Sequence, residues 1–291
     1  MVEIIIWDVQ HGSASYIKSP NGRHIIVDAG LGSYENSDKA FSPLYHLWKN
    51  YGVKQIDYAI LTHPHKDHIE DINNLIELTP KVLRRPKHLT RDDIISPQTA
   101  KMDIPLYEKY IEFSNKYTSN VSGTMNDPTK PENYGGLKIQ TFSTVNCATC
   151  NLNNQSIISV FSYANSKIVI AGDNESPSYN ELFEDISFKN AIKDADILVA
   201  SHHGRASGYH DEFVKLVKLV KPKLTIISDS SKKETSVVTD YGMISSGWTV
   251  FSRTDGSSMK RSTLSTYNDG HIVIKMGYNS ENKPFLNIKK K

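Results

Sequence analysis

Short apolar runs recur along the chain and alternate with stretches whose apolar residues have helical spacing. Apolar runs of about four to eight residues between turn residues predict buried strands. Nine such strands are predicted, at 4–9, 14–18, 24–28, 58–61, 137–142, 157–164, 167–171, 197–200 and 224–227. The chain is therefore expected to build much of its core from sheets.

Three longer stretches have apolar residues three and four positions apart, as on one face of a helix. The first covers 44–51 and is closed by Gly52, the second covers 106–117, and the third covers 213–220 and is stopped by Pro222. A β-rich opening followed by strand and helix alternation predicts an α/β domain in which helices cover the faces of sheets.

No linker divides the chain, so residues 1–291 are predicted to form a single domain. The segment 80–136 differs from the rest because it contains several prolines, one helical stretch and a polar run. We interpret it as an insertion that is either a lid over the substrate or a passive surface excursion. The lysines at 289–291 are expected to be a solvated tail.

The bulk composition excludes few functions. The formal charge of +2, from 34 basic and 32 acidic residues, does not by itself indicate a nucleic-acid partner. No apolar run approaches the roughly 20 residues that span a bilayer, and the first residues lack a basic leader. We expect a cytoplasmic protein with no membrane partner and leave its oligomeric state open.

The two cysteines, Cys147 and Cys150, form a lone Cys-x-x-Cys. A structural zinc site would need further ligands at matching spacing, and none is present. Two reduced thiols in a loop are the favoured interpretation, with accessory metal or redox chemistry as the alternative.

The most informative stretch is 63–68, directly after the apolar run 58–61. It places His63, His65, Asp67 and His68 within six residues. Since residues two apart in an extended segment point the same way, His63 and His65 can bind one ion, while Asp67 and His68 face a neighbouring position. Two adjacent metal sites are predicted.

An apolar stripe at Ile69, Ile72 and Ile76 predicts a helix that begins near Asp67 and His68. A helix N-terminus favours anions because its backbone N–H groups and dipole face them. We therefore expect this end to help hold a phosphate or hydroxide.

Three other strands end in residues of the same kind. Asp173 follows Gly172 after strand 167–171, and His202 and His203 follow strand 197–200. Asp28 closes strand 24–28, where it is more suited to orienting a metal-bound histidine than to binding metal itself.

These runs, in this order, resemble the metallo-β-lactamase superfamily. The closer similarity is to the soluble hydrolase domain of ComEC-type DNA-uptake proteins and to phosphorylcholine esterase. The motifs that carry the resemblance are Asp8-Val9-x-x-Gly12, Asp28-Ala29-Gly30, His63-x-His65-x-Asp67-His68, Asn153-Asn154-Gln155-Ser156, Asp173, Ala195-Asp196-Ile197-Leu198, His202-His203-Gly204 and Arg253-Thr254-Asp255-Gly256.

The resemblance implies a four-layered αββα sandwich with a dinuclear metal site at one edge. It implies that one ion is held by His63 and His65, that the second is held by Asp67, His68 and His203, and that Asp173 bridges them. His202 is then free to contact the substrate. Asn154 and Ser156 stand where many relatives supply another histidine, which leaves the metal open between Zn²⁺ and Mn²⁺.

The chain departs from the subgroup in loops that face the substrate. Gln10-His11-Gly12-Ser13 replaces a pattern with an acidic residue, Arg205 replaces the usual Ser, and the expected Gly-His-Pro is absent after Ile227-Ser228. His11 is a candidate substrate contact, and Arg205 is either a phosphate clamp or one side of a surface salt bridge.

Other histidines and a lysine cluster lack ligand spacing. The histidines are predicted to be structural or solvent-exposed, and the lysines to be a solvated helix face. These residues are His24, His46, His88, His210, His271, Lys215, Lys218 and Lys221.

The favoured function is hydrolysis of a phosphodiester, with DNA or another nucleic acid as a candidate substrate, by a hydroxide that bridges two divalent ions. Asp67 and Asp173 would position the nucleophile, and His202 would donate a proton or hydrogen bond. The alternatives are hydrolysis of a lactone, thioester or β-lactam carbonyl, and a catalytically silent metal-binding module.

Overall fold

The computed structural model describes residues 1–32, 41–210, 222–231 and 235–290 of the chain. The predicted helix at 213–220 and the lysines Lys215, Lys218 and Lys221 lie outside the described residues.

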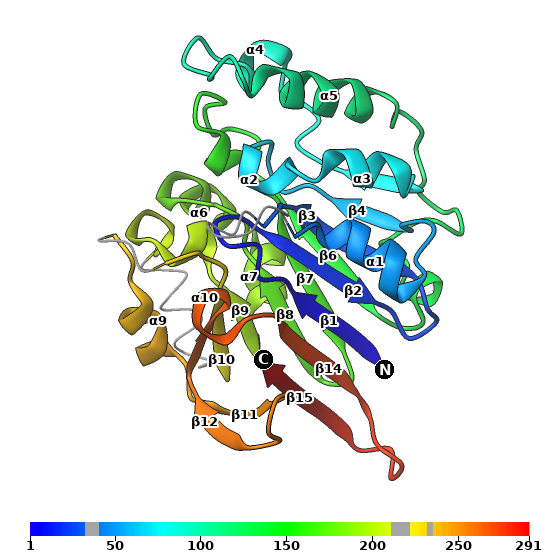
Figure 1. The fold of residues 1–291 in the computed structure, drawn as a ribbon, viewed down its shortest axis with the longest axis vertical. Coiled ribbons are helices and arrows are strands. Elements are labelled where there is room, and N and C mark those ends of the chain that lie inside the picture. The colour runs from blue at the N-terminus through cyan, green and yellow to red at the C-terminus, as the bar shows by residue number, and fades with distance from the viewer. Residues whose placement is uncertain (33–40, 211–221, 232–234, 291) are drawn as a thin grey trace.

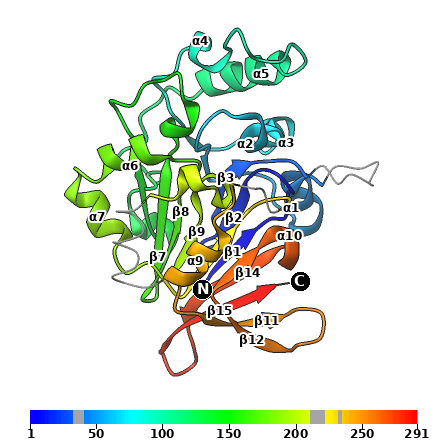
Figure 2. The same ribbon diagram turned by 90° about the vertical axis from the view of Figure 1, so that its left-hand side faces the viewer.

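Two sheets face each other at the centre of the molecule (Figure 1; Figure 2). The larger sheet has the strand order β12 (Ser258–Arg261), β11 (Trp248–Ser252), β15 (Pro284–Lys290), β14 (Ile272–Tyr278), β1 (Val2–Ile6), β2 (Ala14–Lys18), β3 (His24–Ala29), β4 (Tyr58–Ile60) and β5 (Val82–Arg84). The smaller sheet has the order β13 (Thr263–Ser265), β10 (Leu224–Ile227), β9 (Ile197–Val199), β8 (Ser166–Ile170), β7 (Ile158–Tyr163) and β6 (Lys138–Phe142).

Helices cover the outer face of each sheet. The larger sheet packs against α1 (Pro43–Tyr51), α2 (Lys66–Ile69), α3 (Ile72–Glu77), α4 (Arg91–Ile94) and α5 (Ile104–Asn115). The smaller sheet packs against α6 (Ser176–Leu182), α7 (Ile186–Ile192) and α9 (Val238–Ile244). Short helical turns complete the description, namely η1 (Pro131–Tyr134), η2 (Leu152–Gln155), η3 (Ser201–Gly204), η4 (Ala206–Gly208) and α10 (Thr266–Asp269).

Strand β1 illustrates why the apolar runs are nearly continuous. Ile4 and Ile6 point into the core between the two sheets, whereas Ile5 points toward the helices. A strand that is buried on both faces needs apolar side chains on both. The predicted αββα sandwich is confirmed, and each of the nine predicted strands overlaps a strand of the structure.

The C-terminal strands were not predicted, and the interpretation of the terminal lysines as a solvated tail is wrong for the residues described. Lys289 and Lys290 belong to β15, which pairs with both β14 and β11. Ile288 points into the core with no exposed surface, while Lys290 Nζ lies 2.8 Å from Asp269 Oδ1. Buried and charged side chains alternate here, as in a strand with one face on the core and the other toward solvent.

Part of the segment 80–136 belongs to the larger sheet itself. Strand β5 pairs in parallel with β4, and Tyr110 and Phe113 of α5 belong to the buried cluster that also contains the helix-facing residues of this sheet. Helices α4 and α5 lie beyond α2 and α3 at the top of Figure 1. The role of this segment as a lid or as a passive excursion stays a prediction.

The single helix predicted from Asp67 through Ile76 is instead two short helices, α2 and α3. The carbonyl oxygen of Asp67 accepts a hydrogen bond from Ser13 N at 3.1 Å, and Asp71 N donates to Ala29 O at 2.8 Å. These two bonds replace the helical bond between residues 67 and 71, so the helix breaks there. A helix does begin near Asp67 and His68, as expected, but α2 is only four residues long, so its dipole is smaller than that of the continuous helix predicted. The expected help in holding a phosphate or hydroxide stays a prediction.

Two glycines allow this close approach. A Cβ atom at Gly12 would lie 2.5 Å from the Asp67 carbonyl oxygen, and one at Gly30 would lie 2.6 Å from it. The backbone of the loop 10–13 therefore packs directly on the loop that carries the metal motif.

Within the described ranges, none of the helices is long and apolar enough to cross a lipid bilayer.

Candidate metal centre

Parallel strands carry the candidate ligands to one edge of the sandwich. β3 and β4 are parallel neighbours in the larger sheet, and β8 and β9 are parallel neighbours in the smaller sheet. Their carboxyl ends are followed by His63, Asp173 and His203. Since parallel neighbours end at the same edge, residues that are far apart in the chain meet there.

The first cluster, which we call the inner triad, consists of His63, His68 and Asp173. All three are buried, and one ligand atom from each lies within 4.8 Å of the others. His68 Nε2 is 3.3 Å from Asp173 Oδ1, and His63 Nε2 is 4.0 Å from Asp173 Oδ2. Two imidazoles and one carboxylate form a donor set that suits Zn²⁺.

The second cluster, which we call the outer triad, consists of His11, Asp67 and His203, again within 4.8 Å. His203 Nε2 is 3.2 Å from Asp67 Oδ2, and His11 Nε2 is 3.5 Å from the same oxygen. His203 Nε2 also lies 3.3 Å from Asp173 Oδ2. Asp173, which belongs to the inner triad, therefore also contacts the outer triad.

This grouping differs from the sets that the resemblance implies. His68 lies with His63 in the inner triad, although its Nε2 is also 3.8 Å from Asp67 Oδ2, and His11 completes the outer triad although we expected it to contact the substrate. His65 lies outside both triads, with its Nδ1 2.9 Å from His63 Nε2. The division of the six predicted ligands between two ions stays a prediction.

Two imidazole nitrogens provide a direct test of whether the residues suit a metal ion. His68 Nε2 and His203 Nε2 are fully buried and have no hydrogen-bond partner in the part of the chain that the structure describes. Each nitrogen instead has a carboxylate oxygen at 3.2 to 3.3 Å without hydrogen-bond geometry, and a divalent ion would coordinate these nitrogens and oxygens together. The donor set is therefore suited to metal.

The pKa shifts of the triad residues also favour a bound cation. Burial disfavours the cationic form of His68, but the carboxylates of Asp173 and Asp28 outweigh it and raise the pKa of His68 well above its ordinary value. Burial and the neighbouring His68 lower the pKa of His63 well below its ordinary value. Burial likewise opposes the charge of Asp173, yet His203 and His68 hold its pKa low. A cation is thus stabilised between the carboxylates, and a metal ion would displace the protons there.

Asp28 orients part of the inner triad. Its Oδ1 accepts from Thr62 N at 2.7 Å, and its Oδ2 lies 2.8 Å from His68 Nδ1. Because His68 Nδ1–H donates to this carboxylate, His68 Nε2 is directed at Asp173. The backbone of Asp28 has φ of 61°, a left-handed conformation that aspartate tolerates better than most residues.

His202 and His203 lie in a strained turn at η3. Their φ angles are 48° and 54°, which few residues other than glycine adopt. The strain turns the two side chains to different partners. His203 Nδ1 donates to Ser228 O at 2.8 Å, while His202 Nε2 lies 4.0 Å from Asp173 Oδ2.

Asn154 and Ser156 act on the backbone around Asp173. Ser156 Oγ accepts a hydrogen bond from Asp173 N at 3.1 Å, and Asn154 Oδ1 accepts one from Glu175 N at 3.2 Å. Both side chains are buried. These two hydrogen bonds hold the loop that carries Asp173, the residue predicted to bridge two ions.

Three contributors were missed in the sequence. Thr62 Oγ1 donates to Asp28 Oδ2 at 2.9 Å, Glu175 Oε1 lies 3.1 Å from His202 Nδ1, and Asp229 Oδ1 lies 3.3 Å from His11 Nδ1. Asp229 follows strand β10, so the rule that polar residues at strand ends converge was sufficient to find it. The free thiols of Cys147 and Cys150 belong to neither triad.

Comparison with known proteins agrees with this geometry. Residues 7–94 match the family model described as the metallo-beta-lactamase superfamily. No curated relative matches the sequence.

Among solved structures, the metallo-beta-lactamase fold protein YhfI from Bacillus subtilis is 15% identical, with a TM-score of 0.48, over 84% of this chain and 94% of that one. A putative metal-dependent hydrolase from Parabacteroides distasonis is 12% identical, with a TM-score of 0.44, over 91% of this chain and 94% of that one. The matched region 7–94 contains Asp28 and the whole motif from His63 to His68.

Proposed function

We propose that the protein is a metal-dependent phosphodiesterase, with nucleic acid as its favoured substrate. The observation that carries the proposal is the pair of buried nitrogens, His68 Nε2 and His203 Nε2, which lack hydrogen-bond partners among the described residues and face opposite oxygens of Asp173. Two ions in adjacent positions would use both nitrogens. The inner and outer triads, together with His65, would hold them.

Divalent ions bound there would lower the pKa of a water molecule and offset negative charge on the substrate. Asp173 would keep the two triads at a fixed separation, since it contacts His68 and His203 at once. Asp28 and Ser228 hold the far nitrogens of these two imidazoles and so fix the direction of the near ones.

His202 is our candidate proton donor. Its Nδ1 lies 2.8 Å from Ser207 Oγ and 3.1 Å from Glu175 Oε1, which leaves Nε2 directed toward Asp173. In its protonated form, an imidazole held this way can donate from Nε2 to the leaving oxygen of a substrate beside Asp173.

Arg205 supports the choice of a phosphorus ester. Its Nε is buried and has no hydrogen-bond partner in the described ranges, and its charge contributes to the lowering of the His202 pKa, for which burial is the largest cause. A guanidinium close to the proton donor, with an N–H group that has no acceptor, suits a phosphoryl oxygen.

A cavity of about 480 Å³ adjoins the outer triad and gives the substrate room. Its polar walls include His11, Lys66 and Asp67, while Val9 and Leu31 form an apolar wall. That apolar wall favours a second candidate, hydrolysis of a lactone or thioester, because an acyl chain could lie against it.

A substrate panel separates the two candidates. Metal content is first measured by elemental analysis, and the purified protein is then assayed with Mn²⁺ or Zn²⁺ on plasmid DNA, a chromogenic phosphodiester and a lactone. We expect bound metal and phosphodiester turnover. Lactone turnover without phosphodiester cleavage would select the second candidate, and metal-loaded protein inactive on every substrate would contradict both.

One variant tests the role of His202 independently. His202→Ala should keep its metal and lose roughly 10²- to 10⁴-fold in rate, as expected for a general acid. His46→Ala, which removes a histidine on α1, is the matched control and should keep its rate. Loss of metal from His202→Ala would instead make it a ligand.

A further inference from the structure

A groove of about 330 Å³ lies between the end of β5 and the helices α4 and α5, and none of its lining residues belongs to a triad. Its lining contains three cationic side chains and no carboxylate. The lining residues are Arg85, Pro86, Lys87, Leu89, Thr90, Arg91, Ile94, Tyr110, Ile111, Ser114, Asn115 and Thr118.

Arg85 is the central residue of this groove. Only 9% of its surface is exposed, and among the described residues no carboxylate forms an ion pair with it. Its Nη2 donates to the carbonyl oxygens of Ser114 and Tyr117. Within the same ranges, Nη1 and Nε have no acceptor, and they are not among the fully buried atoms, so they are accessible from the groove that Arg85 lines.

The carbonyls at the end of α5 compensate Arg85 only in part. A helix C-terminus carries roughly half a negative charge, whereas a guanidinium carries a full positive charge and five N–H donors. A buried cation with unused donors is suited to an anionic ligand.

The remaining cations differ in how far they are already neutralised. Arg91 donates to Glu108 Oε1 through Nε at 2.8 Å, so its charge is matched. Lys87 is exposed and has no ion pair with a described residue. The groove therefore keeps two uncompensated positive charges, those of Arg85 and Lys87.

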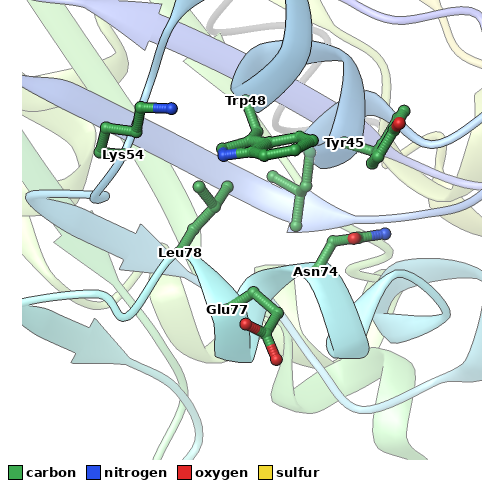
Figure 3. Close-up of a pocket in the computed structure, with 7 residues that line it drawn as sticks. Tyr45, Trp48, Lys54, Asn74, Glu77 and Leu78 are labelled. Atoms are coloured by element: carbon green, nitrogen blue, oxygen red, sulfur yellow. The ribbon is translucent and has the colours of Figure 1, made fainter.

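A second hollow on the same side of the molecule has a different character. It is lined by Trp48 and by both Lys54 and Glu77, which lie on opposite sides of it in Figure 3. Charges of both signs give that hollow no preference for anions, in contrast to the groove at Arg85.

The sheet places the groove at the edge that carries the metal centre. β5 is the parallel neighbour of β4, with Arg84 in register with Ile60. Arg85 therefore follows β5 at the same edge at which Thr62 and His63 follow β4.

We propose that this groove is a phosphate-binding site, distinct from the metal centre, in which Arg85 donates hydrogen bonds through Nη1 and Nε and Lys87 supplies a second charge. The phosphate group comes either from a nucleic-acid backbone that extends past the metal centre or from a small phosphorylated molecule. Both sources present the same tetrahedral oxygens to the guanidinium.

Calorimetric titration of the full-length, metal-loaded protein with inorganic phosphate tests the site. The variant Lys87→Ala should weaken binding at one site about threefold to tenfold, because one charge at a partly open position is removed. Lys101→Ala is the matched control, since this exposed lysine lies in the same segment but does not line the groove. Phosphate held at the metal centre contributes equally to all proteins, so the difference isolates the groove.

Arg85→Lys should weaken the same site more than tenfold, because it keeps the charge but loses the planar fork of donors. Circular dichroism establishes whether the Arg85→Lys variant keeps its helices. If the variant is unfolded, the Lys87→Ala titration alone tests the proposal. Phosphate affinity that is equal in wild type, Lys87→Ala and Lys101→Ala would overturn the proposal.

The same titration with a short single-stranded oligonucleotide in EDTA-free Ca²⁺ buffer distinguishes the two sources. Tighter binding than phosphate, with the loss in Lys87→Ala preserved, supports a nucleic-acid backbone. Oligonucleotide binding that is insensitive to Lys87→Ala, together with sensitive phosphate binding, supports a small phosphorylated ligand.

Discussion

The inner and outer triads contain the same residue types, two histidines and one aspartate, but differ in their access to solvent. Every member of the inner triad is buried, whereas the His11 side chain in the outer triad is 45% exposed and that of Asp67 is 24% exposed. Asp28 fixes one imidazole of the inner triad, while His11 is held only by contacts at 3.3 and 3.5 Å. We therefore propose that the inner triad holds an ion and that the outer triad brings an ion to a substrate.

The largest expected effect follows from removing an inner imidazole. His68→Ala deletes the Nε2 atom that faces Asp173 and leaves Asp28 without its histidine partner. We expect loss of at least one metal ion per chain and a fall in kcat/KM on the order of a thousandfold, since an ion supplies several kcal/mol of charge stabilisation. Elemental analysis and steady-state kinetics measure both, and retention of full metal content would show that the inner triad does not depend on this ligand.

A smaller effect is expected from the residue that orients the inner triad. Asp28→Asn keeps the left-handed backbone accessible but replaces a carboxylate oxygen that accepts from His68 Nδ1. Metal affinity should fall about 10- to 100-fold, measured by competition with a chromogenic chelator. Asp57→Asn, a buried aspartate at the start of β4, is the control and should leave the affinity unchanged.

His11→Ala tests the outer triad. Because His11 makes only long contacts to Asp67 and Asp229, we expect kcat/KM to fall about fivefold to tenfold, which corresponds to the free energy of one hydrogen bond. The ion at the inner triad should be retained. If this variant lost as much metal and rate as His68→Ala, the proposed difference between the triads would be wrong.

The smallest effect is expected at the cysteines. Cys147 and Cys150 are free and lie outside both triads, so Cys147→Ser with Cys150→Ser should keep metal content and rate. Loss of one ion in this double variant would restore the accessory-metal interpretation of the Cys-x-x-Cys.

The strand ends explain how much of this centre could be predicted from sequence. Apolar runs that are buried on both faces are easy to recognise, and His63, Asp173 and His203 follow directly after such runs. Strand β12 was missed because its side chains are largely exposed and its sequence Ser-Met-Lys-Arg has no apolar run. Edge strands of this kind carry little hydrophobic signal.

The sequence was a poorer guide to which candidate ligands group together in each triad. Which imidazole meets which carboxylate depends on tertiary hydrogen bonds, such as that from Ser13 N to the Asp67 carbonyl, and on the left-handed turn at His202 and His203. Neither leaves a periodic pattern in the sequence. The same bond from Ser13 explains why the apolar stripe at Ile69, Ile72 and Ile76 did not produce one continuous helix.

The contact of Gly12 and Gly30 with the Asp67 carbonyl constrains how this site can change. Any side chain at either glycine would collide with backbone and displace Asp67. The side chains of Gln10 and His11, in contrast, line the open cavity. Gln10 has a φ of 60°, a backbone conformation that asparagine, aspartate and glycine adopt most readily, and His11 belongs to the outer triad. An engineer who wants a new substrate preference should therefore keep Gly12, Gly30 and His11 and substitute position 10 with a small set of residues that tolerate its left-handed backbone.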